Sequence, residues 1–120
     1  MPTAYALVLI TVPDEKTAEK ISSTLVEARL AACVSSVPGL KSVYWWEGKL
    51  ERAQESLLLV KTRLSLTPDV VQAVRENHPS KVPEVVVLPI EGGNKDYLDW
   101  IGASTPFIRS PESDLPAQTP

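Results

Sequence analysis

The strongest constraint on the fold is a pair of long apolar segments, within residues 42–62, that flank a tight turn. Residues 44–46 are Tyr-Trp-Trp before the turn, and a run of leucine and valine leads to Thr62 after it. Aromatic and branched side chains favour β-strands, and Gly48 can adopt the positive φ that a short hairpin turn needs. Each arm reaches roughly twice the usual strand length of about 5–6 residues. Because an uncovered apolar strand edge promotes aggregation, this hairpin predicts an oligomer in which another chain pairs with it.

Length and composition predict one domain and no membrane partner. The chain has 120 residues, and single cores of about 100–150 residues are common. Residues 1–104 are expected to form the domain, and residues 105–120, which hold four prolines among polar residues, a flexible tail. No apolar run approaches the roughly 20 residues that cross a bilayer, and the first residues lack the basic start of a secretory signal.

Charge and cysteine content limit the partners and the compartment. Lys and Arg number 12 against 15 Asp and Glu, the net charge is −3, and the basic residues are scattered. Nucleic-acid binders usually concentrate Lys and Arg in a basic stripe, so no nucleic-acid partner is expected. The single cysteine, Cys33, cannot form an internal disulfide, which indicates a reducing compartment and hence the cytoplasm. It follows a predicted helix, where a buried, inert thiol is favoured over a metal ligand or redox group.

Apolar runs predict four strands. Residues 4–12 are nearly all apolar, which suits a strand buried on both faces. A second strand begins at Cys33, is kinked or bulged by Pro38 and Gly39, and continues into the first arm of the hairpin. The second arm is the third strand, and residues 85–90 form the fourth.

Three helices are predicted around these strands. Asp14 is expected to cap the first, which ends near residues 30–32, and Thr67 the second, which stops before Pro79. Asn94 caps a short closing helix. The order β-α-β-β-α-β with an extra C-terminal helix predicts an α+β, ferredoxin-like subunit. Its two main helices would cover one face of an antiparallel sheet, so partner subunits are expected to cover the other face.

Six segments together resemble a known family. They are residues 11–15 (Thr-Val-Pro-Asp-Glu), 29–34 (Arg-Leu-Ala-Ala-Cys-Val), 44–49 (Tyr-Trp-Trp-Glu-Gly-Lys), 59–62 (Leu-Val-Lys-Thr), 78–79 with 83–84 (His-Pro and Pro-Glu), and 97–100 (Tyr-Leu-Asp-Trp). In order and spacing the chain resembles the CutA family of divalent-cation tolerance proteins. The resemblance implies a homotrimer of ferredoxin-like subunits whose long hairpins extend intersubunit sheets. It also implies a role in tolerance of copper and other divalent metals, without a catalysed reaction.

His78 is the only histidine, so an imidazole metal site must use it. Glu84 follows a few residues later, and an imidazole with a carboxylate suits copper or zinc. The alternative is a histidine at a helix C-terminus that hydrogen-bonds the last carbonyls of the helix. A lone histidine without ligand-spaced partners favours this alternative.

The family pattern is incomplete around His78. Copper-binding bacterial relatives place a cysteine where this chain has Ile10 and a second histidine where it has Asn77, and the usual tyrosine after His-Pro is replaced by Ser80. Isoleucine and asparagine lack the soft donors that select copper. The expectation is therefore weak binding of Cu(II) or another divalent cation through His78 and Glu84, or no metal at all.

Tyr44, Trp46 and Lys61 complete the set of candidate site residues. The aromatic side chains either stack on a ligand or pack in a subunit interface, and the interface is favoured because aromatic residues are enriched there. Lys61 lies in an apolar strand, where it either pairs with Glu84 or Glu47 beside an intersubunit cleft or extends to water at the strand end. The two alternatives for Lys61 are equally supported. With His78 and Glu84, these residues are expected to line clefts between subunits.

The leading functional hypothesis is a trimeric, non-enzymatic binding or regulatory protein associated with divalent-metal tolerance or response. No Gly-rich phosphate loop, nucleophile elbow or Cys-His-Asp set is present in the sequence. The main alternative is a structural or protein-partner-binding trimer with no metal role. Two further alternatives are an enzyme that uses Lys61 and His78, and an RNA-binding sheet, which the acidic charge disfavours.

Overall fold

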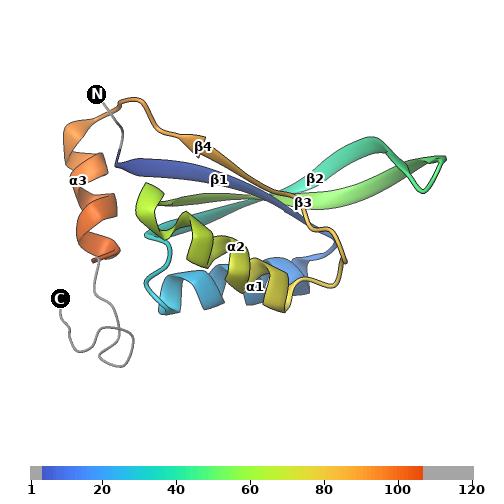
Figure 1. The fold of residues 1–120 in the computed structure, drawn as a ribbon, viewed down its shortest axis with the longest axis horizontal. Coiled ribbons are helices and arrows are strands. Elements are labelled where there is room, and N and C mark those ends of the chain that lie inside the picture. The colour runs from blue at the N-terminus through green and yellow to red at the C-terminus, as the bar shows by residue number, and fades with distance from the viewer. Residues whose placement is uncertain (1–3, 107–120) are drawn as a thin grey trace.

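The computed structural model describes residues 4–106 as an α+β fold with one four-stranded antiparallel sheet (Figure 1). The elements are β1 (Tyr5–Val12), α1 (Glu15–Glu27), β2 (Cys33–Trp46), β3 (Lys49–Arg63), a short 3-10 helix η1 (Leu64–Leu66), α2 (Thr67–Asn77), β4 (Val85–Pro89) and α3 (Lys95–Ser104). The strand order in the sheet is β2-β3-β1-β4. All four predicted strands and three predicted helices are present in the predicted order.

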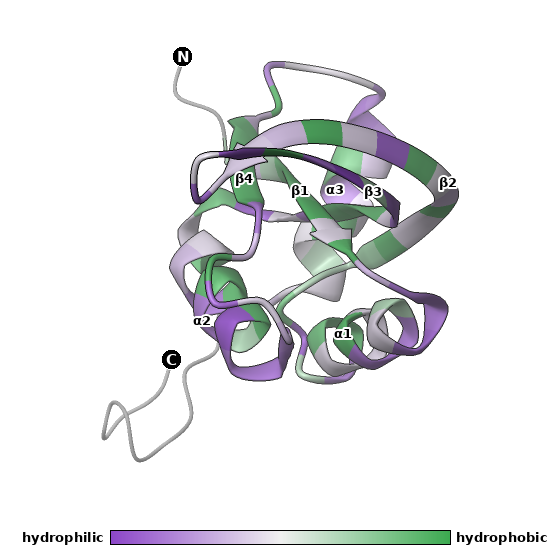
Figure 2. Ribbon diagram, turned by 90° about the vertical axis from the view of Figure 1, so that its right-hand side faces the viewer, coloured by the Kyte–Doolittle hydropathy of each residue, from purple (hydrophilic) through white to green (hydrophobic). Residues whose placement is uncertain are grey.

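Helices α1 and α2 lie side by side against one face of the sheet (Figures 1 and 2). The core lies between these two layers, and its fully buried side chains include Val8, Ile10, Leu58, Val60 and Ile21. In β1 and β3 alternate residues point into this core, as the period of two in a strand requires. The prediction that β1 is buried on both faces is wrong for a single chain, because Leu7 and Leu9 on its other face are only half-buried. No described helix covers that face.

The β2–β3 hairpin is as long as predicted, with arms of 14 and 15 residues. Its tight turn is Glu47-Gly48, and both residues have positive φ, 51° and 79°, which matches the twist of antiparallel strands. The predicted role of Gly48 is therefore confirmed. The predicted bulge is also confirmed, because the β2–β3 register shifts between Val37 and Leu40, with Gly39 at φ 80°.

Helix α1 ends earlier than predicted, at Glu27 instead of residues 30–32. The N–H of Leu30 donates to the Leu25 carbonyl and the N–H of Arg29 to that of Val26, the two bonds of a Schellman motif. Arg29 takes the left-handed position, φ 62°, that glycine usually occupies. The stop was missed because the sequence offers no glycine there.

The caps of the other helices agree in part with the sequence. Asn94 caps α3 by accepting from the N–H of Asp96, and α2 ends at Asn77, before Pro79, as predicted. Thr67 does not cap α2, contrary to the prediction. It is the first residue of the helix, and its hydroxyl donates back to the Leu64 carbonyl because η1 runs directly into α2.

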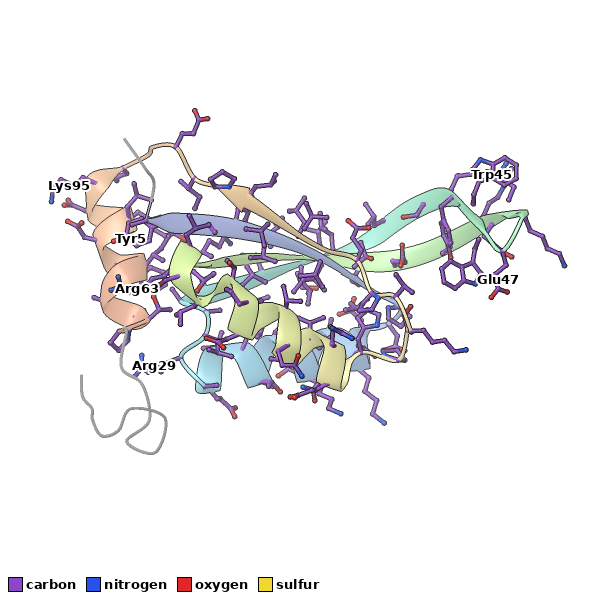
Figure 3. The ribbon with its side chains drawn as sticks, in the orientation of Figure 1. Tyr5, Arg29, Trp45, Glu47, Arg63 and Lys95 are labelled. Atoms are coloured by element: carbon purple, nitrogen blue, oxygen red, sulfur yellow. The ribbon has the colours of Figure 1, made fainter. Side chains whose placement is uncertain are left out.

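Helix α3 packs across the end of the sheet, where the side chain of Arg63 lies against it (Figure 3). The Arg63 guanidinium donates to the carbonyls of Gly102 and Thr105, and Arg29 donates to that of Ser104. Thr105, the expected start of the tail, is fully buried and closes α3. Residues 107–120 of the predicted tail lie outside the described residues.

Asp14 makes the start of α1 sensitive to acid. Its carboxylate accepts from the N–H of Thr17 at 2.7 Å, and this hydrogen bond lowers the pKa of Asp14 below its ordinary value. A lowered folded pKa contributes stability that is present above the unfolded pKa and is lost as the pH falls through the folded pKa. We expect Asp14→Asn, which keeps a cap but cannot ionise, to lower Tm at pH 7 and to approach the wild-type Tm in acid. Thermal unfolding between about pH 7 and pH 2 checks this, and a pH-independent difference would contradict it.

Candidate functional site

A groove lies where the hairpin leaves the four-stranded part of the sheet. Its volume is about 660 Å³, and its lining comes from the end of β1, from β2 and β3, and from residues 78–84, which connect α2 to β4. We refer to it as the hairpin groove. Its lining includes the side chains of Thr11, Tyr44, Trp46, Glu55, His78 and Glu84.

One wall of the hairpin groove is the aromatic side of β2. Ser42, Tyr44 and Trp46 alternate along the strand and therefore share one face. Tyr44 remains 43% exposed and Trp46 42% exposed. Glu55 on β3 is opposite Leu40 immediately after the bulge, and it adds a carboxylate beside this wall.

The opposite wall is the connection between α2 and β4, and His78 fixes it to the sheet. The imidazole Nδ1 accepts from the N–H of Ser80 at 3.0 Å, and Nε2 lies 2.8 Å from the carbonyl oxygen of Thr11. Because Nδ1 accepts, Nε2 must carry the proton that it donates to Thr11. Both ring nitrogens are thus occupied by backbone groups.

Four of the five predicted site residues line this groove together: Tyr44, Trp46, His78 and Glu84. His78 does sit at the C-terminal end of α2, but it bonds the carbonyl of Thr11 on β1 instead of the last helix carbonyls. Thr11 and Glu55 also line the groove, and no pattern in the sequence indicated them as lining residues. Their placement depends on the bulge, which was predicted, and on the position of the α2–β4 connection, which no local pattern encodes.

Lys61 is the predicted site residue that does not line the hairpin groove. Its ammonium group donates to the Ser35 hydroxyl at 2.7 Å and lies 3.8 Å from the Cys33 sulfur. Neither Glu84 nor Glu47 pairs with it within the described chain. Cys33 is partly buried beside it, on the sheet face away from α1 and α2.

That uncovered face of the sheet, which we call the open sheet face, is largely apolar. It carries the half-buried or exposed side chains of Leu7, Leu9, Leu57, Leu59, Val37, Val86 and Leu88. Cross-strand pairing places Leu9 between Leu59 and Val86, and Leu7 between Lys61 and Leu88. These neighbours make one continuous apolar patch across all four strands.

The donors of residues 4–106 do not form a preassembled metal site. No group of three or more His, Cys, Asp or Glu side chains in this range converges to hold an ion. Ile10 is fully buried in the core, and the Asn77 amide donates to the Ala73 carbonyl. To bind a metal through nitrogen, His78 would have to give up one of its two backbone hydrogen bonds.

The fold and the groove define a small α+β protein with an apolar sheet face and a ligand-sized hollow beside a long hairpin. A model of the CutA1 divalent ion tolerance protein family matches residues 6–104 of the sequence. The chain therefore belongs to this family.

Individual relatives agree with this assignment. The divalent-cation tolerance protein CutA of Thermus thermophilus is 52% identical over 82% of this chain and 96% of that protein. A solved Thermus thermophilus structure superposes with a TM-score of 0.82 at 51% identity, over 84% of this chain and 98% of that one. A structure from Archaeoglobus fulgidus, described as a periplasmic divalent cation tolerance protein, gives 0.82 at 40% identity, over 84% and 98%.

Some relatives are longer than this chain. The chloroplastic protein CutA 1 of Oryza sativa is 46% identical over 82% of this chain, which spans only 56% of that protein. The chain matches little more than half of its length.

His78 is expected to hold the α2–β4 connection against β1. In His78→Ala both imidazole hydrogen bonds are lost, and we expect the free energy of unfolding to fall by about 1–3 kcal/mol. Ser80→Ala is the matched control, because it keeps the N–H that donates to His78 and loses only a 3.3 Å bond to Val82. Urea unfolding measures both. Nitrogen-15 NMR of wild-type His78 should show the Nε2–H tautomer, and a protonated Nδ1 would contradict this geometry.

Proposed function

We propose that this chain is the ferredoxin-like subunit of a homotrimeric, non-catalytic binding protein that acts in the response to divalent metal ions. The observation that carries the proposal is the hairpin groove, where residues distant in sequence form one ligand-sized hollow. The family's description and the names of its relatives support the connection with divalent cations. The resemblance links the family to copper, but Ile10 and Asn77 replace the soft donors that select this ion.

The open sheet face supports the trimer. Exposed contiguous apolar surface on a soluble protein usually marks an interaction site. The hairpin supports it as well, since residues 49–55 of β3 pair with β2 alone and leave a free strand edge. A second copy and a third would cover both features in a closed, symmetric assembly.

The chemistry of the hairpin groove supports binding over catalysis. Within its described lining, both nitrogens of His78 are bonded to backbone groups, and no hydroxyl or thiol donates to the imidazole as an activated nucleophile would. Binding of Cu(II) or another divalent cation through His78 and Glu84 is proposed to be weak, because neither residue has a convergent third ligand in the described chain.

A second candidate is a structural or partner-binding trimer without a metal role. The two occupied nitrogens of His78 favour it, because a ligand nitrogen needs a free lone pair. The open sheet face and the hairpin serve this function equally well. A protein partner is then the ligand to be sought.

We propose a cytoplasmic location on the basis of the single unpaired cysteine. The described residues contain no helix with the length and apolar character that a bilayer crossing requires. The names of some relatives give other locations, periplasmic for the Archaeoglobus fulgidus structure and chloroplastic for the Oryza sativa protein. Fractionation of the source cells decides between these compartments.

The oligomer is tested by the mass of the protein in solution. We expect sedimentation equilibrium to give three times the 13.1 kDa of the chain. Leu9→Glu places a charge in the middle of the open sheet face and should yield monomer, because burying an unpaired carboxylate is costly. Val26→Glu, on the exposed side of α1, is the control and should remain trimeric. A monomeric wild-type protein at micromolar concentration would refute the trimer.

Metal binding is tested by calorimetric titration of the trimer with Cu(II). We expect weak binding that disappears in both His78→Ala and Glu84→Gln. Cys33→Ser is the control, because it removes the only thiol and leaves the hairpin groove intact. Binding that is unchanged in the first two variants would remove the metal role and leave the partner-binding trimer.

A further inference from the structure

The charge of the hairpin groove is entirely negative. Glu55 and Glu84 contribute two carboxylates, and no lysine or arginine occurs among the described lining residues. Neither glutamate forms an ion pair within residues 4–106, where the one ion pair joins Lys95 and Asp99 on α3. His78 adds no positive charge, because its Nδ1 accepts a hydrogen bond and the ring is neutral. The groove therefore offers negative charge that has no partner in the described chain.

The aromatic wall, like the carboxylates, favours a positively charged ligand. The faces of Tyr and Trp rings carry the negative part of a quadrupole and attract cations placed over them. Within the described chain, the one aromatic ring contact is between Tyr97 and Trp100, so the rings of Tyr44 and Trp46 do not stack on another ring. Both remain accessible from the groove.

The volume of the hairpin groove and the kind of donors that line it favour an organic cation over a metal ion. The volume of about 660 Å³ is in the range of about 300–1,000 Å³ typical of small-molecule sites. A metal ion needs several convergent lone pairs, and the described residues supply no such cluster. An ammonium group with alkyl substituents needs only aromatic faces and nearby negative charge, which this groove provides.

We propose that the hairpin groove binds a small organic cation, with the ammonium group over Tyr44 and Trp46 and its charge balanced by Glu55 and Glu84. This inference rests on one part of the proposed function, that the groove is the ligand site, and names the chemical class of the ligand. All of these residues belong to one chain, so each subunit of the proposed trimer supplies a complete set of them.

The first experiment compares choline with its uncharged isostere 3,3-dimethyl-1-butanol. The two molecules have nearly the same shape and differ in charge, so the comparison isolates the preference for a cation. We expect saturable calorimetric binding of choline at one site per chain, at least about tenfold tighter than the isostere. Equal binding of the two molecules, or no binding of choline, would overturn the proposal.

Single substitutions on β2 test whether choline contacts Tyr44 and Trp46. Trp46→Leu and Tyr44→Leu should each weaken choline binding by about 2- to 30-fold, the range expected for one cation–π contact. Trp45→Leu is the matched control, because Trp45 is the adjacent residue, is 73% exposed and is not part of the lining. Figure 3 shows Trp45 at the far end of the hairpin. Equal losses in Trp45→Leu and Trp46→Leu would refute the assignment.

The carboxylates are tested in the same way. Glu84→Gln should weaken choline binding several-fold and flatten its dependence on salt, whereas the isostere should bind unchanged. Glu91→Gln, an exposed glutamate outside the groove, is the control. Circular dichroism and sedimentation of each variant verify that the fold and the assembly are retained. An unchanged choline affinity in Glu84→Gln would contradict the charge pairing.

Fluorescence reports the contact directly. The chain has three tryptophans, so Trp45→Phe with Trp100→Phe leaves Trp46 as the only one. Choline should change the emission of this protein, and the isostere should not; identical responses would count against the proposal. If choline fails while the trimer and copper binding hold, only this inference falls. If choline binds to a protein that is monomeric and indifferent to copper, the inference stands and the trimeric metal-response function falls.

Discussion

The architecture depends on a mismatch in length between neighbouring strands. β1 has 8 residues and β3 has 15, and their pairing ends at Val12 and Ser56. From Glu55 back toward the hairpin turn, β3 pairs with β2 alone, so the sheet narrows to the two strands of the hairpin. The β2 bulge shifts the register beside this boundary. Backbone groups on the released edge of β3 lack a β1 partner, and the aromatic side of β2 has no helix beneath it. Both the free edge and the groove arise from this narrowing.

His78 connects that boundary to the helical layer. Its ring hydrogen-bonds both the last part of β1 and the start of the α2–β4 connection. The imidazole therefore holds the wall formed by this connection against the sheet. The same contact explains why a histidine that looks like a ligand in the sequence has a positioning role in the single chain. Around it, the rings of Tyr44 and Trp46 remain accessible from the groove.

Much of the fold could be predicted because its signals are local. Gly48, Asp14, Asn94 and the apolar runs each act over a few residues, and each is found where it was expected. Arg29 follows α1 in the left-handed conformation that glycine usually adopts, so the end of this helix could not be predicted from the sequence. The site was harder to predict. Glu55 and Thr11 join the groove through the bulge and the position of the α2–β4 connection. Lys61 points toward Ser35 because the strand period places it on the open sheet face.

Arg63 gives α3 an unusual kind of attachment. The helix fully buries only Ile101 and Gly102, and part of its hold on the sheet comes from the guanidinium hydrogen bonds of Arg63 to the carbonyls of Gly102 and Thr105. Release of α3 would therefore expose less apolar surface than unfolding of the core. Heat capacity and denaturant sensitivity scale with exposed surface, so such a release would give a smaller signal in calorimetry and in urea titrations than global unfolding. Amide exchange along α3 would reveal it, and α3 could open as a separate unit while the core stays closed.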